Sequence, residues 1–277
     1  MSAPPPTPHD ARALLEWYVA MGVDVAIEET PQDRYAQSAA RAAPAIARAP
    51  EPPAGFATAV APSVVRLAGD PAARLASPDQ TAAAAREAAA SAASLDELRA
   101  ILERFEGCAL KATASRTVFS DGAPGAKLML VGEAPGREED LSGLPFVGRS
   151  GQLLDQMLAA IGLDRSAVYI ANVIPWRPPG NRTPTPQETE TCLPFIRRQI
   201  ELCDPDVLVA LGGAAASSLF RAKDGILKLR GRWLDYETGR RIKAMATLHP
   251  AYLLRSPAQK KLAWRDLKAI KRALEGE

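Results

Sequence analysis

The chain has 277 residues, with 34 Lys plus Arg against 32 Asp plus Glu, and 47% of its residues are apolar. These values are typical of globular proteins, and the length suffices for a large hydrophobic core. No run of about 18 apolar residues occurs, which excludes a membrane-spanning helix, and the first residues lack the pattern of a secretory signal. Three scattered cysteines are too few for a disulfide framework, so we expect a reducing, cytoplasmic environment.

The first third of the chain differs in composition from the rest. Residues 31–100 contain 26 Ala and 8 Pro, but only Tyr35 and Phe56 as aromatic residues. Such a stretch cannot bury enough large apolar side chains to offset the conformational entropy lost on ordering. We therefore predict a short helical segment within residues 1–30 and a largely disordered, Ala/Pro-rich linker over residues 31–93.

Charge divides the chain in the same way. Residues 1–100 carry 8 basic and 12 acidic side chains, whereas residues 101–277 carry 26 basic and 20 acidic ones. A basic domain suits a polyanionic partner, although this surplus is modest. Residues 11–21 have one apolar helical face, which either docks on the main domain or binds a separate protein.

Regular elements are predicted from residue 94 onwards. Ser94, with Glu97 three residues later, predicts a capped helix. Apolar runs at 127–133, 168–174 and 206–212 alternate with helical patterns at 150–161, 187–202 and 213–220, and a hairpin at 232–247 and a helix at 257–274 follow. This alternation predicts an α/β domain over residues 94–277, a three-layer αβα unit with a central four-stranded parallel sheet.

Unusual polar residues follow the predicted strands, where parallel sheets bind their ligands. Glu133 is either a half-buried carboxylate that stabilises positive charge or a cap of the next turn. Asn172 either reads the edge of a nucleobase or is a satisfied core amide. His249 is one of two histidines, and its place after a strand favours a functional role over a structural one.

Two further segments carry alternatives. Phe146 is either a stacking platform for a base or a core aromatic residue. The leucines of Leu253-Leu254-Arg255 either insert into a DNA groove or pack in the core. Neither a GxGxxG fingerprint nor a Walker A motif is present at the first turn, which argues against an NAD enzyme and a P-loop ATPase.

Four strings in fixed order identify a family. GEAPGREED, LPFVGRSGQLL, YIANVIPWRPPGNRTPTP and HPAYLLR resemble the uracil-DNA glycosylase superfamily, specifically the family 4 type of bacteria and archaea. Each string is moderately specific and the set is highly specific; the resemblance covers about residues 101–274. It implies the uracil-DNA glycosylase fold and hydrolysis of the N-glycosidic bond of a uracil flipped out of DNA.

The resemblance also implies roles for single residues. Glu133 and His249 would be catalytic, with Glu139 a weaker candidate that positions or activates water. Phe146 would stack on uracil, Asn172 would bind its Watson–Crick edge, and Gly132 and Ala134 would complete the pocket. The expected DNA contacts are Arg182, Pro250, Leu253, Leu254 and Arg255.

One departure concerns the cofactor. Family 4 enzymes usually hold a [4Fe-4S] cluster on four cysteines, of which this chain has Cys108 and Cys192, while Phe105 and Trp176 stand at the other two positions. Two thiolates cannot supply four ligands, so we expect no cluster and no other metal.

The expected partner is uracil-containing DNA, single- or double-stranded, bound by a monomer in the bacterial cytoplasm beside the nucleoid. The alternative function is a catalytically weak protein that binds uracil-containing or abasic DNA. Its N-terminal tail would recruit it to a repair or replication partner.

Overall fold

A six-stranded sheet lies at the centre of the computed structural model, which describes residues 78–276. The strand order is β1-β3-β2-β4-β6-β5, and the four inner strands are parallel. They are β3 (Tyr169–Asn172), β2 (Leu128–Gly132), β4 (Val207–Leu211) and β6 (Arg241–Thr247). The predicted four-stranded parallel core is therefore confirmed.

Two antiparallel edge strands extend this core. β1 (Asp121–Gly122) pairs with β3, and β5 (Trp233–Glu237) forms the predicted hairpin with β6. Every residue of β2 and β4 is buried, as expected for strands that helices cover on both faces. β5, by contrast, alternates between exposed and half-buried residues, which is the pattern of an edge strand.

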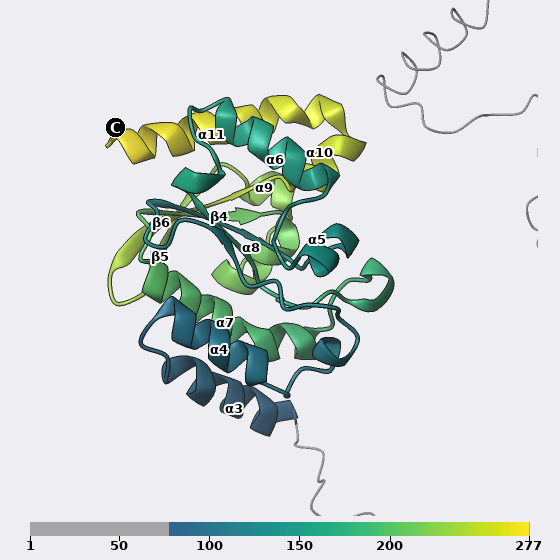
Figure 1. Cartoon of the computed structure of the whole chain (residues 1–277). Helices are drawn as coiled ribbons and strands as arrows, with labels where there is room; N and C mark the ends of the chain where they lie inside the picture. Colours follow the sequence, from purple (N-terminus) through teal and green to yellow (C-terminus); the bar gives the residue numbers. More distant parts are fainter. Residues whose placement is uncertain (1–77, 277) are drawn as a thin grey trace, which may run out of the picture. The chain divides into compact units, whose positions relative to one another are not determined.

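Helices form a layer on each face of the sheet, as Figure 1 shows. One layer contains α3 (Pro78–Ala90), α4 (Leu95–Arg104), α7 (Pro186–Cys203) and α8 (Gly213–Phe220). The other contains α6 (Arg149–Ala159), α10 (Pro250–Arg255) and α11 (Lys260–Glu275). The short helices α5 (Arg137–Ser142) and α9 (Ile226–Leu229) lie in connections. None of the helices within residues 78–276 is long and apolar enough to cross a membrane.

The predicted linker boundary at residue 93 is wrong for residues 78–93. α3 packs against α7, and Ala85 and Ala89 are buried in that contact. The composition argument required large apolar side chains, but alanines let two helix backbones approach closely, and Ala favours the helix itself. Arg198 of α7 also donates two hydrogen bonds to the Ala92 carbonyl oxygen, at 3.0 and 2.7 Å. The predicted helical segment 1–30 and the linker as far as residue 77 lie outside the described residues.

The predicted start of α4 is confirmed. The Ser94 side chain accepts a hydrogen bond from the Glu97 backbone N–H at 3.2 Å, and the Glu97 carboxylate accepts one from the Ala93 N–H at 2.7 Å. These bonds satisfy donors that the first helical turn leaves without backbone partners.

Candidate active site

A cleft of about 990 Å³ lies at the carboxyl ends of the four parallel strands. Each strand places a lining residue there: Glu133 follows β2, Asn172 ends β3, Gly212 follows β4, and His249 follows β6. Because the strands run in one direction, segments far apart in the sequence meet at this edge of the sheet.

The Asn172 amide and the Phe146 ring meet over Gly132. A Cβ atom on Gly132 would lie 2.4 Å from Asn172 Oδ1 and 2.6 Å from Phe146 Cζ, so any side chain there would displace the amide or the ring. Asn172 is 6% exposed, and its amide has no hydrogen-bond partner in the part of the chain that the structure describes. No fully enclosed polar atom of residues 78–276 lacks a partner, so the Asn172 amide opens into the cleft.

Phe146 has a fixed but strained backbone. Its φ of 54° lies in the left-handed region, which costs a residue other than glycine about 1–3 kcal/mol. Arg165 holds this conformation, because its guanidinium donates to the carbonyl oxygens of Phe146 and Pro145 at 2.8 and 2.6 Å. Asp121 and Asp155 in turn hold Arg165, each at 2.8 Å. The ring is therefore positioned before any ligand enters.

The His249 imidazole has a defined tautomer. Its Nδ1 accepts a hydrogen bond from the Ala251 backbone N–H at 3.1 Å, which caps α10. Nδ1 therefore carries no proton, and in the neutral ring the proton lies on Nε2. Burial, with a smaller contribution from the Arg255 charge, lowers the pKa of His249 to about 4. The side chain is thus a neutral donor at pH 7.

The Glu133 carboxyl group lies where β2 ends. It is half-buried, and this burial raises its pKa. The Glu133 backbone oxygen accepts a hydrogen bond from the Ile174 N–H at 2.9 Å, which ties the ends of β2 and β3 together. A partly desolvated carboxylate interacts strongly with positive charge and accepts a proton more readily than one in bulk water.

Glu139 braces the loop that carries Phe146. Its Oε1 accepts hydrogen bonds from the backbone N–H groups of Val147 and Gly148, both at 3.0 Å, and its Oε2 accepts one from Gly136 at 3.0 Å. Glu139 lines the cleft and is buried. Its predicted action on water remains a prediction beside this bracing role.

The expected DNA contacts fall into two groups. Leu254 is 39% exposed and Arg255 is exposed, and both line the cleft. Leu253 is 1% exposed and Pro250 is also buried, and neither lines the cleft, so their contact with DNA stays a prediction. The segment is a helix rather than an extended loop, and α10 turns Leu253 into the core.

Arg182 lies at the cleft with its charge already paired. Its guanidinium donates to both carboxylate oxygens of Glu188, at 2.8 and 2.6 Å. This hydrogen bonding is the main reason that the pKa of Glu188 falls to about 2. A DNA phosphate would compete with Glu188 for Arg182.

Sequence reasoning missed several cleft residues. Arg137 and Arg149 begin α5 and α6 and are exposed at the cleft, and Gln152 also lines it. Both arginines stand within the motif strings, but they begin helices, whereas polar ligand contacts were expected at the strand ends. Arg165 was missed because its partners are distant in sequence.

The four cluster positions do not fit a [4Fe-4S] group. Cys192 Sγ lies 3.8 Å from Cys108 Sγ, and both side chains are buried. The Phe105 ring packs edge-on against Phe195 at 5.1 Å, and the buried Trp176 is among the largest core side chains. Carbon and indole groups cannot ligate iron, and residues 78–276 hold no group of three or more His, Cys, Asp or Glu placed for a metal.

Comparison with known proteins gives the same assignment. Residues 119–268 match the model of the uracil DNA glycosylase superfamily. A type-4 uracil-DNA glycosylase of Thermotoga maritima is 40% identical over 179 residues, which are 64% of this chain and 92% of that protein. One of Archaeoglobus fulgidus is 42% identical over 182 residues, with the same coverage of both chains. A DNA polymerase of Bacillus phage SP01 is 29% identical over 169 residues, which are 61% of this chain and 18% of the polymerase.

The family model covers more than half of the chain, and nearly the full length of the two glycosylases is matched. The resemblance drawn from the motif strings is therefore confirmed: the chain belongs to the uracil-DNA glycosylase superfamily.

Proposed function

We propose that this protein excises uracil from DNA, leaving an abasic site that starts base-excision repair. The observation that carries the proposal is the Asn172 amide, which is nearly buried, lacks a partner within residues 78–276, and lies beside the Phe146 ring. Because this amide opens into the cleft without a protein partner among the described residues, its oxygen and NH₂ group are both available to a ligand. Uracil offers a matching N3–H donor and O4 acceptor next to each other.

Recognition follows from these contacts. The base would stack on Phe146, which contributes on the order of 1–3 kcal/mol. Asn172 Oδ1 would accept the uracil N3–H, and its NH₂ group would donate to O4. The target base must leave the duplex to reach this cleft, at a cost of a few kcal/mol that is smaller in single strands. Leu254, exposed at the cleft edge, is placed to fill the gap in the stack.

The chemistry needs a donor at uracil O2 and a negative group near the sugar. As the C1′–N1 bond breaks, its electron pair leaves with uracil, and the neutral His249 Nε2–H would donate to the developing anion at O2. Glu133 would stabilise positive charge on the sugar and take the proton of the water whose oxygen bonds to C1′. Solvent then protonates the uracil anion.

The proposed reaction needs no cluster. Cys108 and Cys192 stay as buried thiols, with Cys192 donating to Cys108. Phe105 and Trp176 pack as core aromatics. Three free thiols suit a reducing cytoplasm, where we place the protein as a monomer acting on genomic DNA.

The test is release of free uracil from single- and double-stranded DNA that carries one uracil, alongside binding to the same DNA. Matched strands with thymine or cytosine in place of uracil are the control. Release from the uracil strands alone supports the proposal. Tight binding to uracil or abasic DNA without release would instead support a catalytically weak binding protein, whose recruiting segment would lie in residues 1–93.

A further inference from the structure

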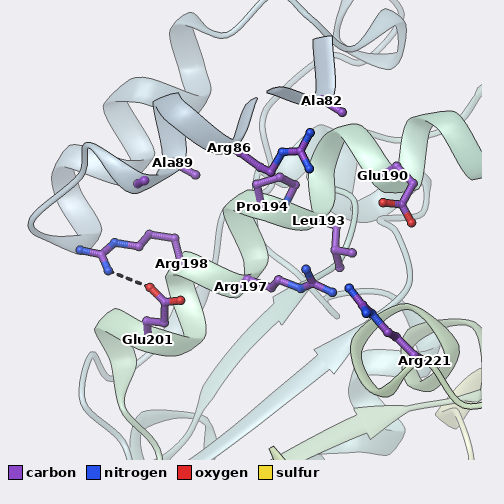
Figure 2. Close-up of a pocket in the computed structure, with 11 residues that line it drawn as sticks. Ala82, Arg86, Ala89, Glu190, Leu193, Pro194, Arg197, Arg198, Glu201 and Arg221 are labelled. Carbon is purple, nitrogen blue, oxygen red and sulfur yellow. Dashed lines mark hydrogen bonds and ion pairs between the residues drawn. The ribbon is translucent and has the colours of Figure 1, made fainter. Parts of the chain in front are cut away.

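A second cavity, of about 260 Å³, lies between α3 and α7 (Figure 2). Four arginines line it, and Arg198 is ion-paired with Glu201 at 2.7 Å. The other three are Arg86 of α3, Arg197 of α7, and Arg221, which follows the last residue of α8. Figure 2 shows the Arg197 and Arg221 side chains extending towards one another. Three positive charges therefore lie close together at one cavity.

Ion pairs within the described part of the protein do not account for the grouping of Arg86, Arg197 and Arg221. Within residues 78–276, no carboxylate forms an ion pair with any of the three arginines. Two acidic residues line the cavity, and one of them, Glu201, pairs with Arg198 at 2.7 Å. Glu190 is the other, so the three arginines leave a surplus of positive charge in the cavity.

The arrangement is also partly fixed before any ligand binds. Arg197 is half-buried and lies beside Tyr236. Burial raises the pKa of Tyr236, and the positive charge of Arg197 offsets part of this rise. Guanidinium groups that face one another without an anion repel, and an anion between them removes that repulsion. The planar fork of Arg binds phosphate through two parallel hydrogen bonds, which makes phosphate a well-matched ligand.

A further cavity lies between this one and the active site. This third cavity, of about 350 Å³, shares Leu193, Arg197 and Arg221 with the first. It also shares Glu133 and Thr183 with the active-site cleft. The three cavities therefore adjoin one another in a row, from the carboxyl ends of the strands, past residues of α7 and α8, to α3.

We propose that this row of cavities, here called the arginine trough, binds the sugar-phosphate backbone of a single DNA strand that flanks the flipped nucleotide. The inference rests on the proposed function, because it takes DNA to be the substrate in the cleft. The Ser217 hydroxyl lines the middle of the trough and suits a phosphate oxygen. The hydroxyls of Thr189 and Ser218, which also line it, already donate to backbone carbonyl oxygens of their own helices. The row of cavities ends at the cleft, which favours a DNA strand over an acidic peptide, because the strand that carries the flipped base extends beyond the cleft.

The test compares Arg86→Gln/Arg221→Gln with wild type. Both side chains are exposed, so the folded structure should not depend on them. We expect about tenfold weaker binding at low salt to a single strand of about 30 nucleotides, and a slope of log K against log[salt] reduced by about 1.4 for two lost phosphate contacts. An oligomer of about 5 nucleotides with a central uracil is too short to enter the trough, so its excision rate should stay unchanged. The further change Arg197→Gln should reduce the slope again.

The matched control is Arg265→Gln/Arg272→Gln, which removes two exposed arginines from α11 on the other face of the sheet. Its binding and salt slope should equal those of wild type. An unchanged slope in Arg86→Gln/Arg221→Gln would overturn the proposal, and so would a loss confined to binding of a poly-glutamate peptide. Binding is measured on a thymine-only strand, so this result is decisive even if the wild-type protein releases no uracil.

Discussion

The Phe146 ring lies 5.5 Å from the His249 ring, centroid to centroid, and the two planes are inclined by 32°. One residue precedes α6 and the other precedes α10, so the contact joins two helical segments above the sheet. A base stacked on Phe146 would therefore have an edge next to the His249 Nε2–H. The proposed stacking residue and the proposed hydrogen-bond donor would then contact the same base.

Replacement of His249 by Asn should separate its two roles. Asn is a good N-cap residue, so His249→Asn keeps an acceptor for the Ala251 N–H while removing the Nε2 donor. We expect single-turnover uracil release to fall about 10²–10³-fold, with little change in the melting temperature. A rate within a factor of about three of wild type would show that His249 does not stabilise the leaving group.

The pH dependence should come from Glu133 rather than His249. His249 has a pKa of about 4, so it stays neutral, and its donor stays available, as the pH falls from 8 to 5. The active form of Glu133 is the carboxylate, whose pKa burial raises, so the rate should fall as the pH falls through that raised value. This acidic limb should disappear in Glu133→Gln, which should also be much slower. An acidic limb retained in Glu133→Gln would assign it to another group.

The close approach at Gly132 gives a sharp steric prediction. The Cβ of Gly132→Ala would lie 2.4 Å from Asn172 Oδ1, so the amide must move, and we expect at least a 100-fold loss of single-turnover rate. Gly213→Ala is the matched control at the same cleft, because its Cβ would meet Ile226 at 3.5 Å, an ordinary contact distance. The control should keep wild-type activity. Equal activity in both variants would contradict the pocket geometry.

Glu139→Gln tests whether bracing dominates at that position. Gln has one acceptor oxygen where Glu139 has two, so at least one of the three backbone N–H groups loses its partner, which costs about 1–3 kcal/mol. We expect a clear fall in melting temperature and less than a tenfold change in rate at low temperature. A 10²–10⁴-fold rate loss with unchanged stability would make Glu139 the residue that acts on water.

The purified protein should contain no iron. Cys108→Ala/Cys192→Ala should fold and release uracil at nearly the wild-type rate. The two thiols are buried core groups where α7 packs against the segment after α4, and they have no part in the proposed reaction. Iron analysis and an absorbance spectrum of freshly purified protein provide the measurement. About four iron atoms per chain, lost in the double variant, would contradict this account.

The sequence predicted the strands, most helices and the residues at the strand ends because each of these depends on a local pattern. The direction of single side chains was harder to predict. Leu253 is buried and its neighbour Leu254 is exposed, because both lie in α10 and successive residues of a helix point to different sides. α3 was assigned to the linker because its buried face consists of alanines, which carry no strong hydrophobic signal. The bracing by Arg165 depends on contacts between distant segments, which no local pattern reveals.

The most direct test of the central claim is the single-turnover rate of uracil release by Asn172→Ala relative to wild type, with thermal unfolding measured in parallel. The claim is that this amide, open to the cleft, binds the base that is removed. The account predicts that wild type releases one uracil per uracil-containing strand and that Asn172→Ala is about 10²–10³-fold slower with unchanged stability. Release by Asn172→Ala at the wild-type rate, or no release by wild type, would contradict it.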